Sequence, residues 1–223
     1  VSVSKEAEDE GLRRGMKVLL ARRMSHGAQL LPYNQSLYAR LNQYIYSTIQ
    51  RFTPIVEPSG YGKFYLDMTG MERIYKSHEQ AGSNISKLVQ DQVGLNPVLG
   101  ISQNKLVSRI STSVVPDTIH RIMAGHETQF LSPLDTLVIP TVHEPTVWKL
   151  IKFLILNQVR QIQSLVNSAT DARRLFGRYA LPLSREVHGQ DLSVVRPSVM
   201  KDHIVEQTVL IEDTNDTTIL WFE

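Results

Sequence analysis

Three carboxylates lie within segment 57–72: Asp67, and the possible acid pair Glu57 and Glu72, which no second predicted element positions. Paired carboxylates can hold the divalent metals that neutralise developing charge in phosphoryl transfer. Strand alternation places Asp67 on the same face as Lys63 and Tyr65, and a lysine ammonium repels a metal ion. We therefore predict that Asp67 makes structural hydrogen bonds, and a metal-ligand role is the alternative.

Cysteine and histidine patterns predict no metal site. The chain has no cysteine, which excludes disulfides, thiolate zinc sites and cysteine nucleophiles. The histidines lack metal-ligand spacing, since even His120 and His126 are six residues apart and would not align on one helix face. We expect surface or capping histidines, no bound metal and no cofactor.

Basic residues supply the candidate nucleic-acid surface. The net charge is only +2, so any affinity for DNA has to come from local clusters of Lys and Arg. A charged helix face that is simply solvated is the alternative. The candidate DNA-binding residues are Lys105, Arg109, Lys149, Lys152 and Arg160, with Arg173, Arg174 and Arg178 as further members of the set.

The predicted secondary structure alternates between helix and strand up to about residue 115. Apolar residues at helical spacing predict an amphipathic helix over 34–51, entered through Asn34 and ended before Pro54. Pro58-Ser59-Gly60 predicts a hairpin turn. The other predicted elements are helices at 4–10, 16–23, 78–93 and 102–114, and strands at 55–56, 63–68 and 98–101. This alternation predicts an α+β fold.

Short helices dominate after Pro116 and Asp117 and predict a small all-α domain. They are expected at 127–131, 145–155, 159–166 and 170–188, and a strand is expected at 204–211.

The chain has no apolar run long enough for a membrane span, and Val1 begins no signal-peptide pattern. Asp216 reads as a helix cap just before the chain stops, so both ends are expected to be truncations.

Glu57-Pro58-Ser59-Gly60-Tyr61-Gly62-Lys63-Phe64-Tyr65-Leu66-Asp67-Met68-Thr69-Gly70 resembles the palm strand of Y-family (DinB/UmuC-type) translesion DNA polymerases. Three further blocks resemble that family in the same order along the chain. They are Glu6-Ala7 with Gly11 to Met16 in the fingers, Gly100 to Leu106 in the palm, and Phe176-Gly177 with Gly189-Gln190-Asp191 at the end of the thumb.

The departures from the family pattern fall on its functional positions. The resemblance implies that the pair of catalytic acids is replaced by Gly62 and Lys63, and that the nucleotide-binding Tyr and Arg are replaced by Lys5 and Glu8. Lys105 matches the family lysine that reaches the triphosphate. The thumb hairpin that would approach a DNA phosphate reads Ile139 to Pro145, with an acid and a second proline that weaken it.

This combination resembles the ImuB-like branch of the family, which lacks the catalytic acids and retains Leu66-Asp67-x-Thr69-Gly70. The resemblance implies a cytoplasmic, non-catalytic adaptor in translesion synthesis and damage-induced mutagenesis. Its partners would be DNA, bound weakly without sequence preference, a sliding clamp and an error-prone replicative-type polymerase. The alternatives are a divergent active translesion polymerase and a plain interaction module without DNA affinity.

The predicted organisation follows from the resemblance. We expect a fingers portion over 1–33, a palm portion over 34–115, a helical thumb with a degenerate helix-hairpin-helix over 116–192, and a linker with the start of a little-finger domain over 193–223.

Overall fold

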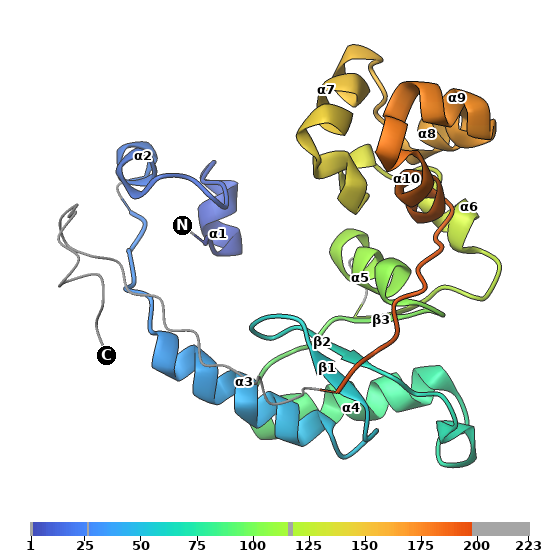
Figure 1. The fold of residues 1–223 in the computed structure, drawn as a ribbon. Helices are drawn as coiled ribbons and strands as arrows, with labels where there is room; N and C mark the ends of the chain where they lie inside the picture. Colours follow the sequence, from blue (N-terminus) through green and yellow to red (C-terminus); the bar gives the residue numbers. More distant parts are fainter. Residues whose placement is uncertain (1, 26, 116–117, 198–223) are drawn as a thin grey trace, which may run out of the picture. The chain divides into compact units, whose positions relative to one another are not determined.

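The structure is a computed structural model that describes residues 2–25, 27–115 and 118–197 (Figure 1). These residues separate into two units between Gln43 and Tyr44. The finer division into fingers, palm, thumb and little-finger portions stays a prediction. The predicted strand at 204–211 and the helix after Asp216 lie outside the described residues.

Three helices start in the first unit. In α1 (Lys5–Asp9), the Ser4 hydroxyl accepts the Ala7 N–H at 3.3 Å, and the helix is followed by Gly11 at φ +92°. The second helix is α2 (Val18–Met24). The third is α3 (Gln35–Ile49), where Asn34 Oδ1 accepts the Leu37 N–H at 3.0 Å. All three confirm helices predicted from the sequence, and Asn34 caps the helix as expected.

The predicted hairpin follows α3 in the second unit. Strands β1 (Val56–Pro58) and β2 (Phe64–Leu66) pair antiparallel, with Glu57 opposite Tyr65. The turn begins one residue later than predicted because Pro58, which has no N–H, ends β1, and the Ser59 N–H donates to the Lys63 carbonyl at 2.8 Å. The short turn η1 (Met71–Arg73) follows the hairpin.

A parallel strand pair lies beside helix α4 (His78–Val93). Strand β3 (Leu99–Ile101) and strand β4 (Ile119–Arg121) pair in parallel, and α5 (Lys105–Val114) makes the crossover between them. Gly100 lets α5 approach β3, because a Cβ there would lie 2.3 Å from the Ser108 carbonyl oxygen. The helix predicted at 102–114 begins three residues later, at Lys105, because Asn104 is its N-cap. Strand β4 was not predicted.

The rest of the second unit is helical, as predicted. Its elements are α6 (Glu127–Leu131), η2 (Thr136–Val138), η3 (Pro140–His143), α7 (Pro145–Phe153), α8 (Val159–Val166), α9 (Ala169–Phe176), η4 (Gly177–Tyr179) and α10 (Ala180–Val187). The prediction of one helix over 170–188 was wrong, because Gly177 at φ +54° ends α9 and a new helix follows.

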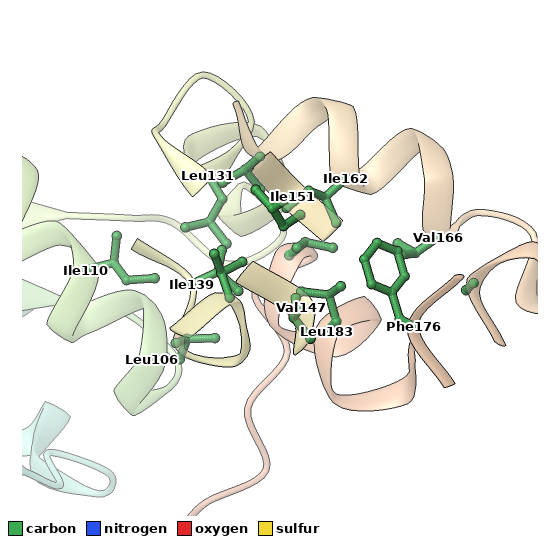
Figure 2. Packing of buried hydrophobic residues seen from close by; sticks show 14 of the residues in the cluster. Leu106, Ile110, Leu131, Ile139, Val147, Ile151, Ile162, Val166, Phe176 and Leu183 are labelled. Carbon is green, nitrogen blue, oxygen red and sulfur yellow. The ribbon is translucent and has the colours of Figure 1, made fainter. Parts of the chain in front are cut away.

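One hydrophobic core joins α5 to these helices. Figure 2 shows Leu106 and Ile110 of α5 on one side of Ile139, with Ile162 and Phe176 on the other side. All of these side chains are buried. The core therefore fixes the start of α5 against the helical part of the unit. None of the helices in the described part of the chain combines the length and the apolar composition of a membrane-spanning segment.

Candidate functional site

The N-terminus of α5 is built by side chains from distant parts of the chain. Asn104 caps the helix, because its Oδ1 accepts the Val107 N–H at 3.0 Å. Asp191 Oδ2 accepts the Leu106 N–H at 3.1 Å, and Asn104 Nδ2 donates to the Gly189 carbonyl at 2.7 Å. The segment that follows α10 is thus fastened to the first turn of α5.

Lys105, the first residue of α5, pairs with Glu57 of β1. Its Nζ donates to the two carboxylate oxygens of Glu57 at 2.9 and 3.0 Å and lies 5.4 Å from the centroid of the Tyr65 ring. The side chains of Lys105 and Glu57 are 16% and 24% exposed. The Arg196 backbone N–H also donates to Glu57, at 2.7 Å. The carboxylate therefore holds both the lysine and the segment after α10.

The pKa of Glu57 reflects these contacts. Burial acts to raise the pKa of its carboxyl, but the hydrogen bonds from the Arg196 N–H and the Lys105 ammonium, together with the charge of Lys105, lower it below its ordinary value. Glu57 is therefore a carboxylate at neutral pH. Its negative charge offsets the positive charge of Lys105, the family's triphosphate lysine by resemblance.

A second carboxylate contacts the turn at residues 139–145, which the sequence predicts to be a weakened hairpin. Glu186 of α10 accepts the backbone N–H of Thr141 at 2.9 Å. Pro140 and Pro145 have no N–H to offer, and Thr141 is buried. The turn itself is the short helix η3. The N–H of Thr141 is therefore already satisfied by an acid from the same chain.

These groups surround one open hollow of about 560 Å³ in the second unit. Three basic and three acidic residues are among those that line it: Lys105, Arg109, Arg185, Glu57, Glu186 and Asp191. The three acids are the ones that accept from the Lys105 ammonium, the Thr141 N–H and the Leu106 N–H. Three donors that could bind an anion beside the hollow are thus each paired with an internal carboxylate.

Gly62 and Lys63 lie in the loop of the β1–β2 hairpin. Gly62 has φ +68°, a conformation that favours glycine over any residue with a Cβ. Asp67 Oδ1 accepts the Thr69 N–H at 2.9 Å, a structural hydrogen bond of the kind expected for this residue. In the part of the chain that the structure describes, no three His, Asp or Glu side chains are grouped to hold a metal ion.

The other predicted site residues are spread over separate elements. Lys5 and Glu8 are exposed on α1. Lys149 and Lys152 are exposed on α7, where the Lys152 ammonium lies 4.5 Å from the centroid of the Trp148 ring. Arg160 is exposed on α8. The structure thus brings Lys105 and Arg109 together at the hollow, and it places Lys149 and Lys152 on another helix.

Sequence reasoning missed two charged residues and one ion pair at the hollow. Arg185 and Glu186 were not singled out, and the pairing of Glu57 with Lys105 was not foreseen. Lys105 and Arg109 are four residues apart on a helix, so their shared face could be predicted. The contacts of Glu57 and Glu186 join residues 48 and 45 positions apart, and no local pattern reports such pairs.

The comparisons with known proteins agree with this fold. Residues 1–113 match the impB/mucB/samB family, and the chain belongs to that family. It is 29% identical over 220 residues to a DNA polymerase IV of Dehalococcoides mccartyi, covering 98% of this chain and 56% of the relative. A DNA polymerase IV of Neisseria meningitidis serogroup B is 29% identical over 232 residues, covering 95% of this chain and 66% of the relative.

Solved structures show the same α+β fold. The insertion ternary complex of Dbh DNA polymerase superposes with a TM-score of 0.74 at 18% identity, covering 86% of this chain and 56% of that one. DinB from Sulfolobus solfataricus gives a TM-score of 0.71 at 19% identity, covering 85% of this chain and 56% of that one. The chain is thus a Y-family DNA polymerase homologue that spans about half the length of the relatives it matches.

Proposed function

We propose that this chain belongs to a non-catalytic, ImuB-like Y-family protein that serves translesion synthesis as an adaptor. The observation that carries the proposal is the pair Gly62 and Lys63, which stand where the family resemblance expects catalytic acids. A glycine and a lysine cannot hold the metal ions that phosphoryl transfer requires. The positive φ of Gly62 supports the proposal further, because the loop is shaped for a glycine.

The ion pair of Lys105 with Glu57 also supports a non-catalytic protein. An incoming triphosphate would need its ammonium, and that ammonium is bonded to both oxygens of Glu57. A nucleotide would have to displace a carboxylate that also accepts the Arg196 N–H. The exposed acid Glu8 stands where the resemblance expects a phosphate-binding arginine, so it would repel the same ligand.

The proposal includes weak DNA binding without sequence preference. The hollow offers Arg109 and Arg185 as exposed cations, but the three carboxylates beside it offset its positive charge. The Thr141 N–H, which the resemblance would aim at a DNA phosphate, is bonded to Glu186. Binding would then rest on a few scattered phosphate contacts.

By the same resemblance, the partners would be a sliding clamp and an error-prone replicative-type polymerase. The test is genetic and biochemical. Deleting the gene should lower the frequency of damage-induced mutation, and the whole protein should co-purify with the clamp or the second polymerase after DNA damage. An unchanged mutation frequency, together with a purification that recovers neither protein, would contradict the adaptor function.

An active translesion polymerase is the second candidate. It is favoured by the relatives, which are DNA polymerase IV proteins matched over nearly the whole of this chain, and by the presence of Lys105. Such an enzyme would need metal-binding acids other than residues 62 and 63. Its distinguishing property is template-directed nucleotide incorporation, which the adaptor lacks.

A further inference from the structure

The end of helix α7 combines backbone strain with exposed apolar side chains. Ile155 has φ +54° and is the only residue other than glycine with positive φ among residues 2–25, 27–115 and 118–197. Phe153 and Ile155 are 82% and 71% exposed. We call Phe153, Leu154 and Ile155 the α7 tip.

Hydrogen bonds show why the backbone takes this conformation. The Leu156 N–H donates to the Ile151 carbonyl at 3.0 Å, and the Ile155 N–H donates to the Lys152 carbonyl at 3.2 Å. This is the pattern of a helix end that needs a left-handed residue at position 155, which is usually glycine. A β-branched residue is a clear exception there.

Packing within the unit does not account for the isoleucine. Ile155 is mostly exposed, so the contacts that normally offset such strain are missing within the part of the chain that the structure describes. Phe153, two residues earlier, is also large, apolar and exposed. A glycine would satisfy the same turn at lower energy. The two side chains therefore fit a role that requires contact with another molecule.

The charges around the α7 tip indicate the chemistry of that molecule. Segment 145–170 contains Lys149, Lys152 and Arg160 but no Asp or Glu. Asp135, which pairs with Gln158 near the tip, uses its carboxylate to cap η2 by accepting the Leu137 N–H. The helix that ends in the apolar tip thus carries two lysines and no acid.

The arrangement favours a protein over DNA. The Lys152 ammonium lies over the ring of Trp148, one turn back along α7, so this cation is beside the tip and not in front of it. Protein interfaces typically have aromatic and aliphatic side chains at their centre and charged groups at their rim. Phe153 and Ile155, with the lysines of α7, fit this pattern. DNA binding would instead bring the cations forward to the phosphates.

We propose that the α7 tip docks into an apolar pocket, bordered by Asp and Glu residues, on a partner protein. This inference deepens the proposed adaptor function and rests on it, since it names where a partner binds. It also assigns Lys149 and Lys152 to that partner, although their sequence pattern suggested DNA.

The test places the photo-reactive residue p-benzoylphenylalanine at position 153 of the whole protein, in cells exposed to DNA damage. The matched control carries it at Leu181, which is 60% exposed on α10. We expect a discrete protein adduct at position 153 and not at 181, cross-linked to a peptide with Asp or Glu nearby. Adduct yield should fall about tenfold or more in Ile155→Gly and in Lys149→Glu/Lys152→Glu.

Thermal unfolding of the same variants separates docking from a structural role. Ile155→Gly should unfold at the same temperature as the parent or a higher one, because glycine relieves the strain, yet lose the adduct. An adduct to DNA alone, no adduct above the Leu181 control, or an adduct that survives both sets of substitutions would overturn the proposal. A polymerase activity would refute the non-catalytic function without affecting this result.

Discussion

Lys105 and Glu57 form a two-point ion pair, with the lysine Nζ 2.9 and 3.0 Å from the two carboxylate oxygens. The pair joins the first turn of α5 to the β1–β2 hairpin across 48 residues of sequence. It also offsets the positive charge of Lys105, which the family resemblance matches to the lysine that reaches the triphosphate. Its strength can be measured separately from any activity.

Glu57→Gln should lower the free energy of unfolding at neutral pH by about 1 kcal/mol, the scale of a partly exposed, hydrogen-bonded ion pair. The pKa of Glu57 is lowered in the folded protein, so its contribution is present above the ordinary carboxyl pKa and is lost as pH falls through the lowered value. Urea unfolding of both proteins at neutral and acidic pH measures this.

The control is Glu79→Gln, which breaks an exposed ion pair between Glu79 of α4 and Arg121 of β4. The hydrogen bond from Arg121 lowers the pKa of Glu79 to about 2. Because solvent screens that pair, the loss at neutral pH should be smaller than for Glu57→Gln. An equal or larger loss for the control would contradict the importance of the Lys105–Glu57 contact.

Gly100→Ala should destabilise the protein by about 2 to 3 kcal/mol, the upper range for overpacking. The added Cβ would lie 2.2 Å from Ser111 Oγ and 2.3 Å from the Ser108 carbonyl oxygen, and the latter belongs to the backbone of α5 and cannot rotate away. Denaturant unfolding is the measurement.

The matched variant Gly94→Ala meets open space and has φ +74° and ψ 17°, the left-handed helical region, so only backbone strain of about 1 kcal/mol is expected. If Gly94→Ala proved the more damaging substitution, the close packing of α5 on β3 would not be the reason for glycine at position 100.

DNA binding should be weak and should decrease as salt is added, with a shallow slope because few phosphates are contacted. Arg109→Ala and Arg185→Ala should each reduce the slope of log affinity against log salt by about 0.9. Lys152→Ala should leave it unchanged, because we assign that residue to a partner protein. Fluorescence anisotropy with one duplex over a range of salt concentrations measures all four proteins.

Tight binding that is insensitive to salt would contradict this account of the hollow. So would an equal effect of Lys152→Ala and Arg109→Ala, since it would place α7 on the DNA as well.

Helices with clear local signals were predicted from the sequence, and elements that depend on distant contacts were not. Helix 78–93 was found with its bounds, and 127–131 likewise, because apolar spacing and capping residues are local. Strand β4 contains one apolar residue, Ile119, followed by His120 and Arg121, so it lacks the apolar run that indicated β3. It exists through pairing with β3 across α5. The break at Gly177 was missed because glycine can also occur within helices.

The candidate site likewise contains residues that the sequence indicated and contacts that it did not. The family resemblance pointed to Lys105 and to the loop residues Gly62 and Lys63. The resemblance did not indicate the hydrogen-bond partners at the site. Glu57, which binds Lys105, and Glu186, which binds the Thr141 N–H, come from elements far away in sequence. A strained residue such as Ile155 carries no sequence signal either, since its φ follows from how α7 ends.

Primer extension by the whole protein decides whether it is catalytic. With magnesium or manganese, all four nucleotides and an undamaged or damaged template, we predict no incorporation above a no-enzyme control. Gly62→Asp/Lys63→Glu should also stay inactive, because Glu8 still replaces the arginine expected there and Glu57 still holds Lys105. Template-directed incorporation by the unmodified protein would contradict the claim and identify an active polymerase.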